Sequence, residues 1–199
     1  MATTAERIRR WTRAEYDRLI DLGVFRSGEH LELLDGHLIV GEPQGSLHAT
    51  AVGLVDDALR ACFGDGWVVR CQMPIALDDE SEPEPDVAVV PGARRDYAAD
   101  HPSRPVLVVE VAESSLADDR AIKGALYARA GIADYWILNL ADRVLEVYRN
   151  PPARSQPRAA WRYREVTILG ETASIVPLAR PDVPVDVASL LPARGSYLG

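Results

Sequence analysis

Two acidic residues occupy positions where a β-sheet would bury them. Asp86 begins the apolar run Val87–Val90, and Glu110 interrupts the run Val106–Val111. Such runs are typical of buried strands, and because one loop connects them we expect the two strands to be neighbours. A carboxylate inside a buried strand costs free energy unless it is paired or binds a metal. Two carboxylates at adjacent strand ends form the hard oxygen site that Mg²⁺ or Mn²⁺ prefers.

Each acidic residue also has a simpler interpretation. Asp86 closes a segment, residues 78–86, that holds six acids in nine positions, and we expect the other five to be solvated. Asp86 would then be one more solvated loop acid, and Glu110 would form a salt bridge to an arginine at a strand end. The metal-site hypothesis is favoured because each residue occupies the unusual position in its own element.

Lys123 is the only lysine among the 22 basic residues of the sequence. Because arginine fills the generic surface positions, this lysine is a candidate for chemistry that needs a compact ammonium with a tunable pKa. The alternative is a lysine left by chance on a helix surface. Lys123 lies on the predicted helix that follows Glu110, so its ammonium could reach the same cleft and help to orient or deprotonate a water at the metal.

Capping and hydrophobic patterns predict the elements that must position these residues. Thr12 to Glu15 forms a predicted capping box, and Asp35-Gly36 between apolar runs is a strong hairpin signal. The predicted helices cover residues 13–22, 46–63 and 115–130, and the predicted strands cover residues 30–34, 37–40, 69–77, 87–90, 106–111, 134–140, 145–148, 161–168 and 173–177. A linker is expected at 149–160. This order predicts an α/β (α+β) fold, a mixed central β-sheet flanked by helices, in a single domain over residues 1–199.

Composition excludes several classes of protein. The 199 residues are 47% hydrophobic and 26% charged, which is ordinary for a globular chain and too apolar for a disordered one. No apolar run is long enough for a membrane span or a secretory signal, so we expect no membrane partner and a cytoplasmic protein. Two cysteines cannot form a disulfide framework. The net charge of −8 argues against high-affinity, non-specific binding of nucleic acid.

Several stretches of the sequence together resemble one known family. Pro85–Val90, Val108–Ala112 and Asp119–Leu138 are similar, in this order, to the Uma-two family of restriction-endonuclease-like proteins in the PD-(D/E)XK nuclease superfamily. Glu32 within Leu31–Gly36, and His48 after Gly45, also match the family's N-terminal pattern. The resemblance covers about residues 12–190.

The resemblance implies a nuclease-type core with a divalent metal at the edge of the sheet. Asp86 and Glu110 would be metal ligands together with the carbonyl of Val111, and Glu32 would be an additional acid near the metal. The superfamily's usual lysine position, two residues after the glutamate, is Ala112 here. Lys123 would therefore have to supply the ammonium from the helix.

The remaining candidates have both functional and structural interpretations. His30, His37, His48 and His101 lack metal-ligand spacing, and a local capping role for His48 is favoured over a phosphate contact. Tyr127 either lines the cleft or belongs to the core. Tyr135 and Trp136 read as core or interface aromatics near a sheet edge, which predicts a homodimer. The arginines of residues 149–164, with Trp161 and Tyr163, either contact nucleic acid or form a solvated face.

Two functions from different classes are compatible with these observations. The first is a Mg²⁺-dependent endonuclease that hydrolyses DNA phosphodiester bonds, in which Lys123 stabilises the developing charge. The second is a non-catalytic binding or oligomerisation module on a nuclease scaffold. The acid–acid–lysine set favours the enzyme, and the net negative charge favours the module.

Overall fold

A six-stranded mixed sheet forms the centre of the molecule. The computed structural model describes residues 8–26, 28–41, 44–153 and 161–194. The strand order is β3-β4-β5-β6-β7-β8, and only the pair β5–β6 is parallel. The strands are β3 (Trp67–Cys71), β4 (Val87–Pro91), β5 (Leu107–Ala112), β6 (Asp134–Asn139), β7 (Val144–Arg149) and β8 (Glu165–Gly170).

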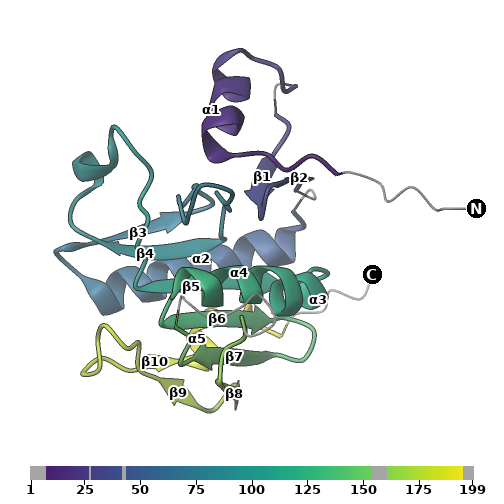
Figure 1. The fold of residues 1–199 in the computed structure, drawn as a ribbon. Helices are drawn as coiled ribbons and strands as arrows, with labels where there is room; N and C mark the ends of the chain where they lie inside the picture. The colour runs from purple at the N-terminus through teal and green to yellow at the C-terminus, as the bar shows by residue number, and fades with distance from the viewer. Residues whose placement is uncertain (1–7, 27, 42–43, 154–160, 195–199) are drawn as a thin grey trace, which may run out of the picture.

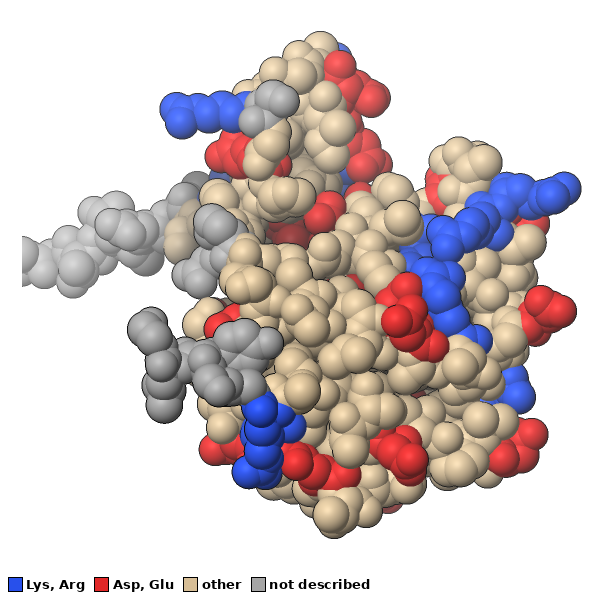
Figure 2. Space-filling model, turned by 180° about the vertical axis from the view of Figure 1, so that it is seen from behind, with Lys and Arg blue, Asp and Glu red and all other residues tan. Residues whose placement is uncertain are grey.

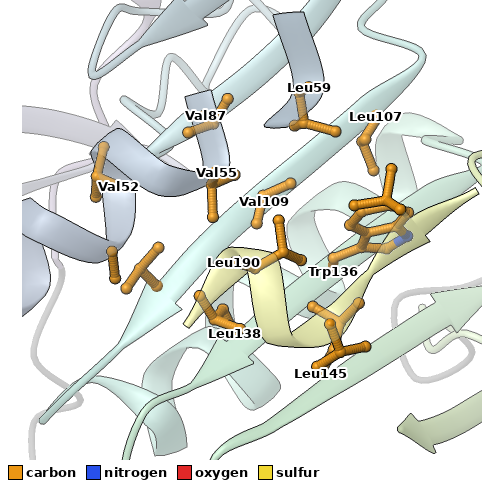
Figure 3. Packing of buried hydrophobic residues seen from close by; sticks show 14 of the residues in the cluster. Val52, Val55, Leu59, Val87, Leu107, Val109, Trp136, Leu138, Leu145 and Leu190 are labelled. Carbon is orange, nitrogen blue, oxygen red and sulfur yellow. The ribbon is translucent and has the colours of Figure 1, made fainter. Parts of the chain in front are cut away.

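Helices cover both faces of this sheet, as Figure 1 shows. The long helix α2 (Ser46–Phe63) lies on one face, where α5 (Val187–Leu190) and the small sheet of β9 (Ser174–Ile175) and β10 (Val185–Asp186) join it. Alternate residues of the strands point into this layer, so that Val109 of β5 and Trp136 of β6 pack with Val55 of α2 (Figure 3).

The opposite face of the sheet carries a second core. Val108 and Ala112 of β5 point toward it, and it includes Tyr127 and Tyr135. Glu110 lies between Val108 and Ala112 and has the same strand parity, so its side chain emerges on this face. The strand alternation therefore aims one carboxylate of the predicted site at the helix that follows β5.

That helix is interrupted where the sequence predicts a continuous one. It consists of α3 (Leu116–Asp118), a π-helical turn η2 (Asp119–Lys123) and α4 (Gly124–Ala130), and it ends at Gly131, whose φ of 76° permits the left-handed cap. A π-helical turn adds a residue to one turn and is frequent at functional sites. Lys123 is the last residue of this turn.

The N-terminal segment forms a small unit beside the sheet (Figure 1). It contains α1 (Arg13–Asp21), with the predicted capping box between Thr12 and Glu15, and the hairpin of β1 (Leu31–Leu34) and β2 (His37–Val40). Leu31 and Leu33 enter its own apolar cluster with Tyr16. The bridge between Leu33 and Glu82 joins this unit to the chain that leads into β4.

Several predicted boundaries were wrong. The strand expected over residues 69–77 ends at Cys71, because Gln72 adopts a left-handed φ of 50° that ends the extended backbone. The strand expected over residues 161–168 begins at Glu165, and the expected linker starts later because β7 continues to Arg149. The rest of that linker, residues 154–160, lies outside the described residues. Among the described residues, no helix is long and apolar enough to cross a membrane.

Candidate active site

Asp86 lies immediately before β4 and is held by donors from α2, from β5 and from the residue that follows β3. Its Oδ2 accepts the backbone N–H of Val111 at 2.8 Å. Its Oδ1 lies 3.0 Å from Nε2 of His48, in the first turn of α2, and 3.4 Å from the amide nitrogen of Gln72. Burial alone would raise the pKa of Asp86, but the hydrogen bond and charge of His48, the N–H of Val111 and the charge of Lys123 together outweigh burial, and the pKa is lowered. Asp86 is therefore a carboxylate held in its ionised form.

Glu110 is the most deeply buried acid of the site, with 2% of its surface exposed. Its Oε1 accepts the hydroxyl of Tyr127 at 2.6 Å, and its Oε2 lies 3.4 Å from the backbone nitrogen of Asp86. Burial raises the pKa of Glu110 to about 8, against the opposing effect of Lys123. A cation beside Glu110 would therefore favour its ionised form.

Lys123 brings an ammonium group to this acid. Its Nζ lies 3.2 Å from Oε1 of Glu110 and 3.4 Å from Oε1 of Glu32, and the side chain is 16% exposed. Burial alone would lower the pKa of Lys123, but the surrounding carboxylates, Glu110 first and then Glu32, Asp119 and Asp86, together outweigh burial and raise the pKa above its ordinary value. The ammonium of Lys123 is therefore a fixed positive charge. The single lysine of the sequence points into the cluster of carboxylates.

Glu32 reaches the site from β1. Leu31 and Leu33 face the N-terminal unit's own cluster, so alternation turns Glu32 the other way, toward Lys123. Its Oε1 also accepts the backbone N–H of Glu84 at 2.7 Å. The structure therefore brings Glu32, Asp86, Glu110 and Lys123 into one cluster, as their positions in the sequence led us to expect. Their chemical roles stay predictions.

The carbonyl of Val111 is turned toward the same cluster. The next carbonyl along β5, that of Ala112, accepts the N–H of Leu140 on the β6 side. Carbonyls of successive strand residues point in opposite directions, and the N–H and C=O of one residue point the same way. The N–H of Val111 reaches Asp86, so its carbonyl faces the Asp86 side as well.

These oxygens fit a divalent metal of the Mg²⁺ type. The donors are two carboxylates and one backbone carbonyl, which are the hard ligands that such ions prefer. Within the described part of the chain, no three His, Cys, Asp or Glu side chains form a ready metal-binding group. Two carboxylates and one carbonyl would leave further coordination positions to water, and Mg²⁺ usually keeps several of its waters.

Most of the chain matches one protein family. A family model described as "Putative restriction endonuclease" (Uma2) matches residues 13–187. The chain belongs to the Uma2 family. The resemblance seen in the sequence is thereby confirmed over nearly all of the core.

One solved structure with the same fold comes from Anabaena variabilis ATCC 29413, and its title describes "a putative nuclease belonging to DUF820". The two chains superpose with a TM-score of 0.64 at 15% sequence identity, and the match covers 85% of this chain and 94% of the other. The likeness confirms the predicted mixed α/β architecture of the Uma2 chain. No curated protein matches the sequence.

Two side chains of the site were missed or misread in the sequence. His48 was expected to cap α2 locally, but its ring contacts Asp86 instead. Gln72 carried no signal, because its contribution depends on the left-handed backbone that ends β3. Tyr127 fulfils both interpretations offered for it, since it is fully buried and its hydroxyl binds Glu110.

Other expectations need correction. Glu82 is 3% exposed rather than solvated, since the bridge to Leu33 draws its backbone into the interior. Tyr135 and Trp136 are fully buried in β6, a central strand, so they do not lie near a sheet edge. Arg149 forms an ion pair with the buried Asp134 and does not belong to a solvated face.

Proposed function

We propose that the protein is a Mg²⁺-dependent endonuclease that hydrolyses phosphodiester bonds in DNA. The observation that carries this proposal is the cluster of Asp86, Glu110 and Lys123, in which the lysine ammonium lies 3.2 Å from the buried glutamate. Membership of a family described as restriction endonucleases supports the same reaction class. The cluster supports hydrolysis over a purely structural module, because a buried glutamate with a raised pKa, placed between an ionised aspartate and a lysine ammonium, is costly unless it has a function.

In this proposal Asp86, Glu110 and the carbonyl of Val111 hold the metal. A bound Mg²⁺ would supply Lewis-acid polarisation of the phosphate and a lower pKa for an attacking water. Asp86 is prepared for this role because the donors of His48 and Val111 hold its carboxylate ionised and fix its orientation. Tyr127 does the same for Glu110 by holding Oε1, which leaves Oε2 turned toward Asp86.

Lys123 acts as a fixed positive charge in this scheme. Its raised pKa keeps the ammonium protonated, so it is suited to stabilise negative charge that develops on the phosphate rather than to deprotonate water. The compact ammonium fits between two carboxylates, where the planar guanidinium of arginine would need a different geometry.

We expect the protein to recognise DNA through local contacts at the site more than through electrostatic attraction by its whole surface. On the face that Figure 2 shows, acidic side chains are spread over the surface, and basic side chains form a band on the right with smaller separate groups at the upper left and lower left. The net charge of −8 also disfavours broad electrostatic attraction of phosphates. We therefore propose that DNA is held mainly at the metal site.

We also propose a cytoplasmic homodimer. Both cysteines, Cys62 and Cys71, are free thiols, as is usual in a reducing compartment. Of the two edge strands, β3 and β8, we propose that β8 pairs with a second copy, because its Val166 and Ile168 are 52% and 63% exposed. Exposed branched residues on an edge strand are typically covered by a partner.

A cleavage screen tests the proposed function. Supercoiled plasmid, single-stranded DNA and structured DNA are incubated with the protein and Mn²⁺ or Mg²⁺, with Asp86→Asn as the control against a contaminating nuclease. Cleavage by the parent that the variant lacks supports the proposal. Binding of DNA with no cleavage of any form supports the non-catalytic module instead.

A further inference from the structure

Glu32 is tied to the backbone that leads into the site. Its Oε1 accepts the N–H of Glu84 at 2.7 Å, two residues before Asp86. The neighbouring Leu33 exchanges two backbone hydrogen bonds with Glu82, at 2.7 and 3.3 Å. The carboxylate of Glu32 therefore adds one hydrogen bond to the backbone pairing between β1 and residues 82–84. This bond fixes the position of Glu32 relative to Asp86.

The same oxygen of Glu32 contacts Lys123. The ammonium of Lys123 lies between Glu32 and Glu110, at 3.4 and 3.2 Å, and these two carboxylates come from different layers of the molecule. An ammonium has three protons and can serve both carboxylates at once. Among the described residues, Glu32 and Glu110 are the two acids within ion-pair distance of Lys123, so Glu32 contributes a second anchor for this side chain.

A second anchor for Lys123 matters because a metal bound to Glu110 would weaken the attraction between Glu110 and the ammonium. A divalent cation on Glu110 would repel an ammonium a few ångströms away. If Lys123 depended only on Glu110, it would either compete with the metal or be driven from the site. A carboxylate that is already fixed by the backbone of Glu84 can keep the ammonium in place.

We propose that Glu32 is a positioning residue for Lys123 and is not a ligand of the metal. Its catalytic consequence rests on the function proposed above, but the contact between the two side chains does not. The role of the N-terminal unit, with α1, β1 and β2, is then to deliver one carboxylate to the helix that carries the single lysine.

The single lysine makes a direct test possible. Lysine labelled with ¹³C gives one set of side-chain signals in the full-length protein, and these report Lys123 alone. Without metal, we expect the order parameter of its Cε to fall by roughly a third or more in Glu32→Gln, toward values typical of flexible groups. Glu84→Gln is the matched control, since it removes the same charge from a neighbouring side chain and should leave the order parameter within error of the parent.

An unchanged order parameter in Glu32→Gln, or an equal fall in Glu84→Gln, overturns the positioning role. The amide side chain of the Glu32→Gln variant retains an acceptor for the N–H of Glu84, which favours folding. If Glu32→Gln does not fold, Glu32→Asp replaces it, because the shorter carboxylate keeps the charge and withdraws from Lys123. A loss of order in the folded aspartate variant supports the proposal, and no loss overturns it.

Metal binding and cleavage give the second readout. We expect Glu32→Gln to lower kcat about tenfold or more while the Kd for Mn²⁺, measured by calorimetry, stays within roughly threefold of the parent. A Kd weakened about tenfold or more would make Glu32 a ligand and would overturn the proposal. If the parent neither binds Mn²⁺ nor cleaves DNA, the proposed nuclease function fails, and the metal-free order parameter alone decides the role of Glu32.

Discussion

Tyr127 donates its hydroxyl to Oε1 of Glu110 at 2.6 Å, and Lys123, one turn earlier on the same helix, directs its ammonium to the same oxygen at 3.2 Å. The spacing of four residues places both side chains on one face of the helix. One helix face therefore supplies two donors to a single buried carboxylate. This arrangement leaves the other oxygen of Glu110 to face Asp86. Mutations can therefore test the two carboxylates separately from the side chains that hold them in place.

The metal site is tested by removing charge without changing shape. Asp86→Asn and Glu110→Gln should each weaken Mn²⁺ binding by about tenfold or more, because each replaces an anionic ligand by a neutral one. Isothermal titration calorimetry with Mn²⁺ measures the effect. Asp57→Asn is the control, since it removes an exposed acid of α2. Parental Mn²⁺ affinity in both site variants would place the metal elsewhere.

Replacing Lys123 separates charge from geometry. Lys123→Arg keeps a cation near Glu32 and Glu110 and should retain most of the free energy of unfolding, yet abolish metal-dependent DNA cleavage. Lys123→Ala should lose cleavage and also destabilise the fold by about 3–5 kcal/mol, because it leaves Glu32 and Glu110 without the cation between them. Denaturant unfolding and a plasmid-nicking assay measure the two effects. Cleavage at the parental rate by the arginine variant would reduce Lys123 to an electrostatic spacer.

Tyr127→Phe tests the support of Glu110. Removing the hydroxyl should lower the free energy of unfolding by about 1–3 kcal/mol. It should also raise the Kd for Mn²⁺ by roughly tenfold, as loss of a partner that orients a ligand commonly does. Tyr135→Phe is a close control, since this buried hydroxyl binds the backbone carbonyl of Asp119 and no carboxylate. If both phenylalanine variants change the Mn²⁺ affinity equally, the effect comes from the packing of the two rings.

The parts of the site that were predictable lie on regular elements. Asp86, Glu110 and Lys123 could be found because each breaks the pattern of its own segment: an acid at a strand start, an acid within an apolar strand, and one lysine among arginines. These are local features of the sequence, and strand pairing of β4 with β5 then brings the first two together.

The parts that were not predictable depend on contacts distant in the sequence. His48 reaches Asp86 only because α2 begins beside the start of β4, and Gln72 only because its backbone turns left-handed after β3. The edge position expected for Tyr135 and Trp136 failed for a similar reason. Local patterning marks a buried strand, but the pairing of β6 with β5 on one side and β7 on the other determines that β6 is interior, and β8 then covers β7.

Assembly through β8 is tested by charging its exposed face. We expect a dimeric mass by light scattering at tens of micromolar, on the scale where exposed strand edges associate. Ile168→Lys should give a monomer, because it places an unpaired charge on the edge that a second copy would cover. Val40→Lys, at a similarly exposed position of β2, should remain dimeric. A monomeric parent would contradict the homodimer, and a dimer unaffected by both variants would place the interface elsewhere.

Glu82 gives the fold a pH dependence that is independent of the metal site. It is 3% exposed, with Arg13 and His101 each 3.8 Å from its carboxylate oxygens. Burial, with a contribution from Asp17, raises the pKa of Glu82 to about 7 from an ordinary 4.5. Below pH 4.5 this carboxyl is protonated in the folded and the unfolded chain, so it has no ionisation cost on folding. As the pH rises from 4.5 to 7, the unfolded chain ionises first, and the folded state loses stability.

Glu82→Gln should therefore become increasingly stable relative to the parent as the pH rises. The difference in the free energy of unfolding between variant and parent should grow by roughly 3 kcal/mol between about pH 4.5 and about pH 8, the equivalent of the raised pKa. Urea unfolding at several pH values measures it, and Asp79→Asn, at an exposed acid of the same segment, controls for the loss of one negative charge. Contributions from other groups, such as Glu110, are common to both proteins and cancel in the difference. A difference that stays constant over this range would mean that Glu82 ionises in the folded protein as it does in the unfolded chain.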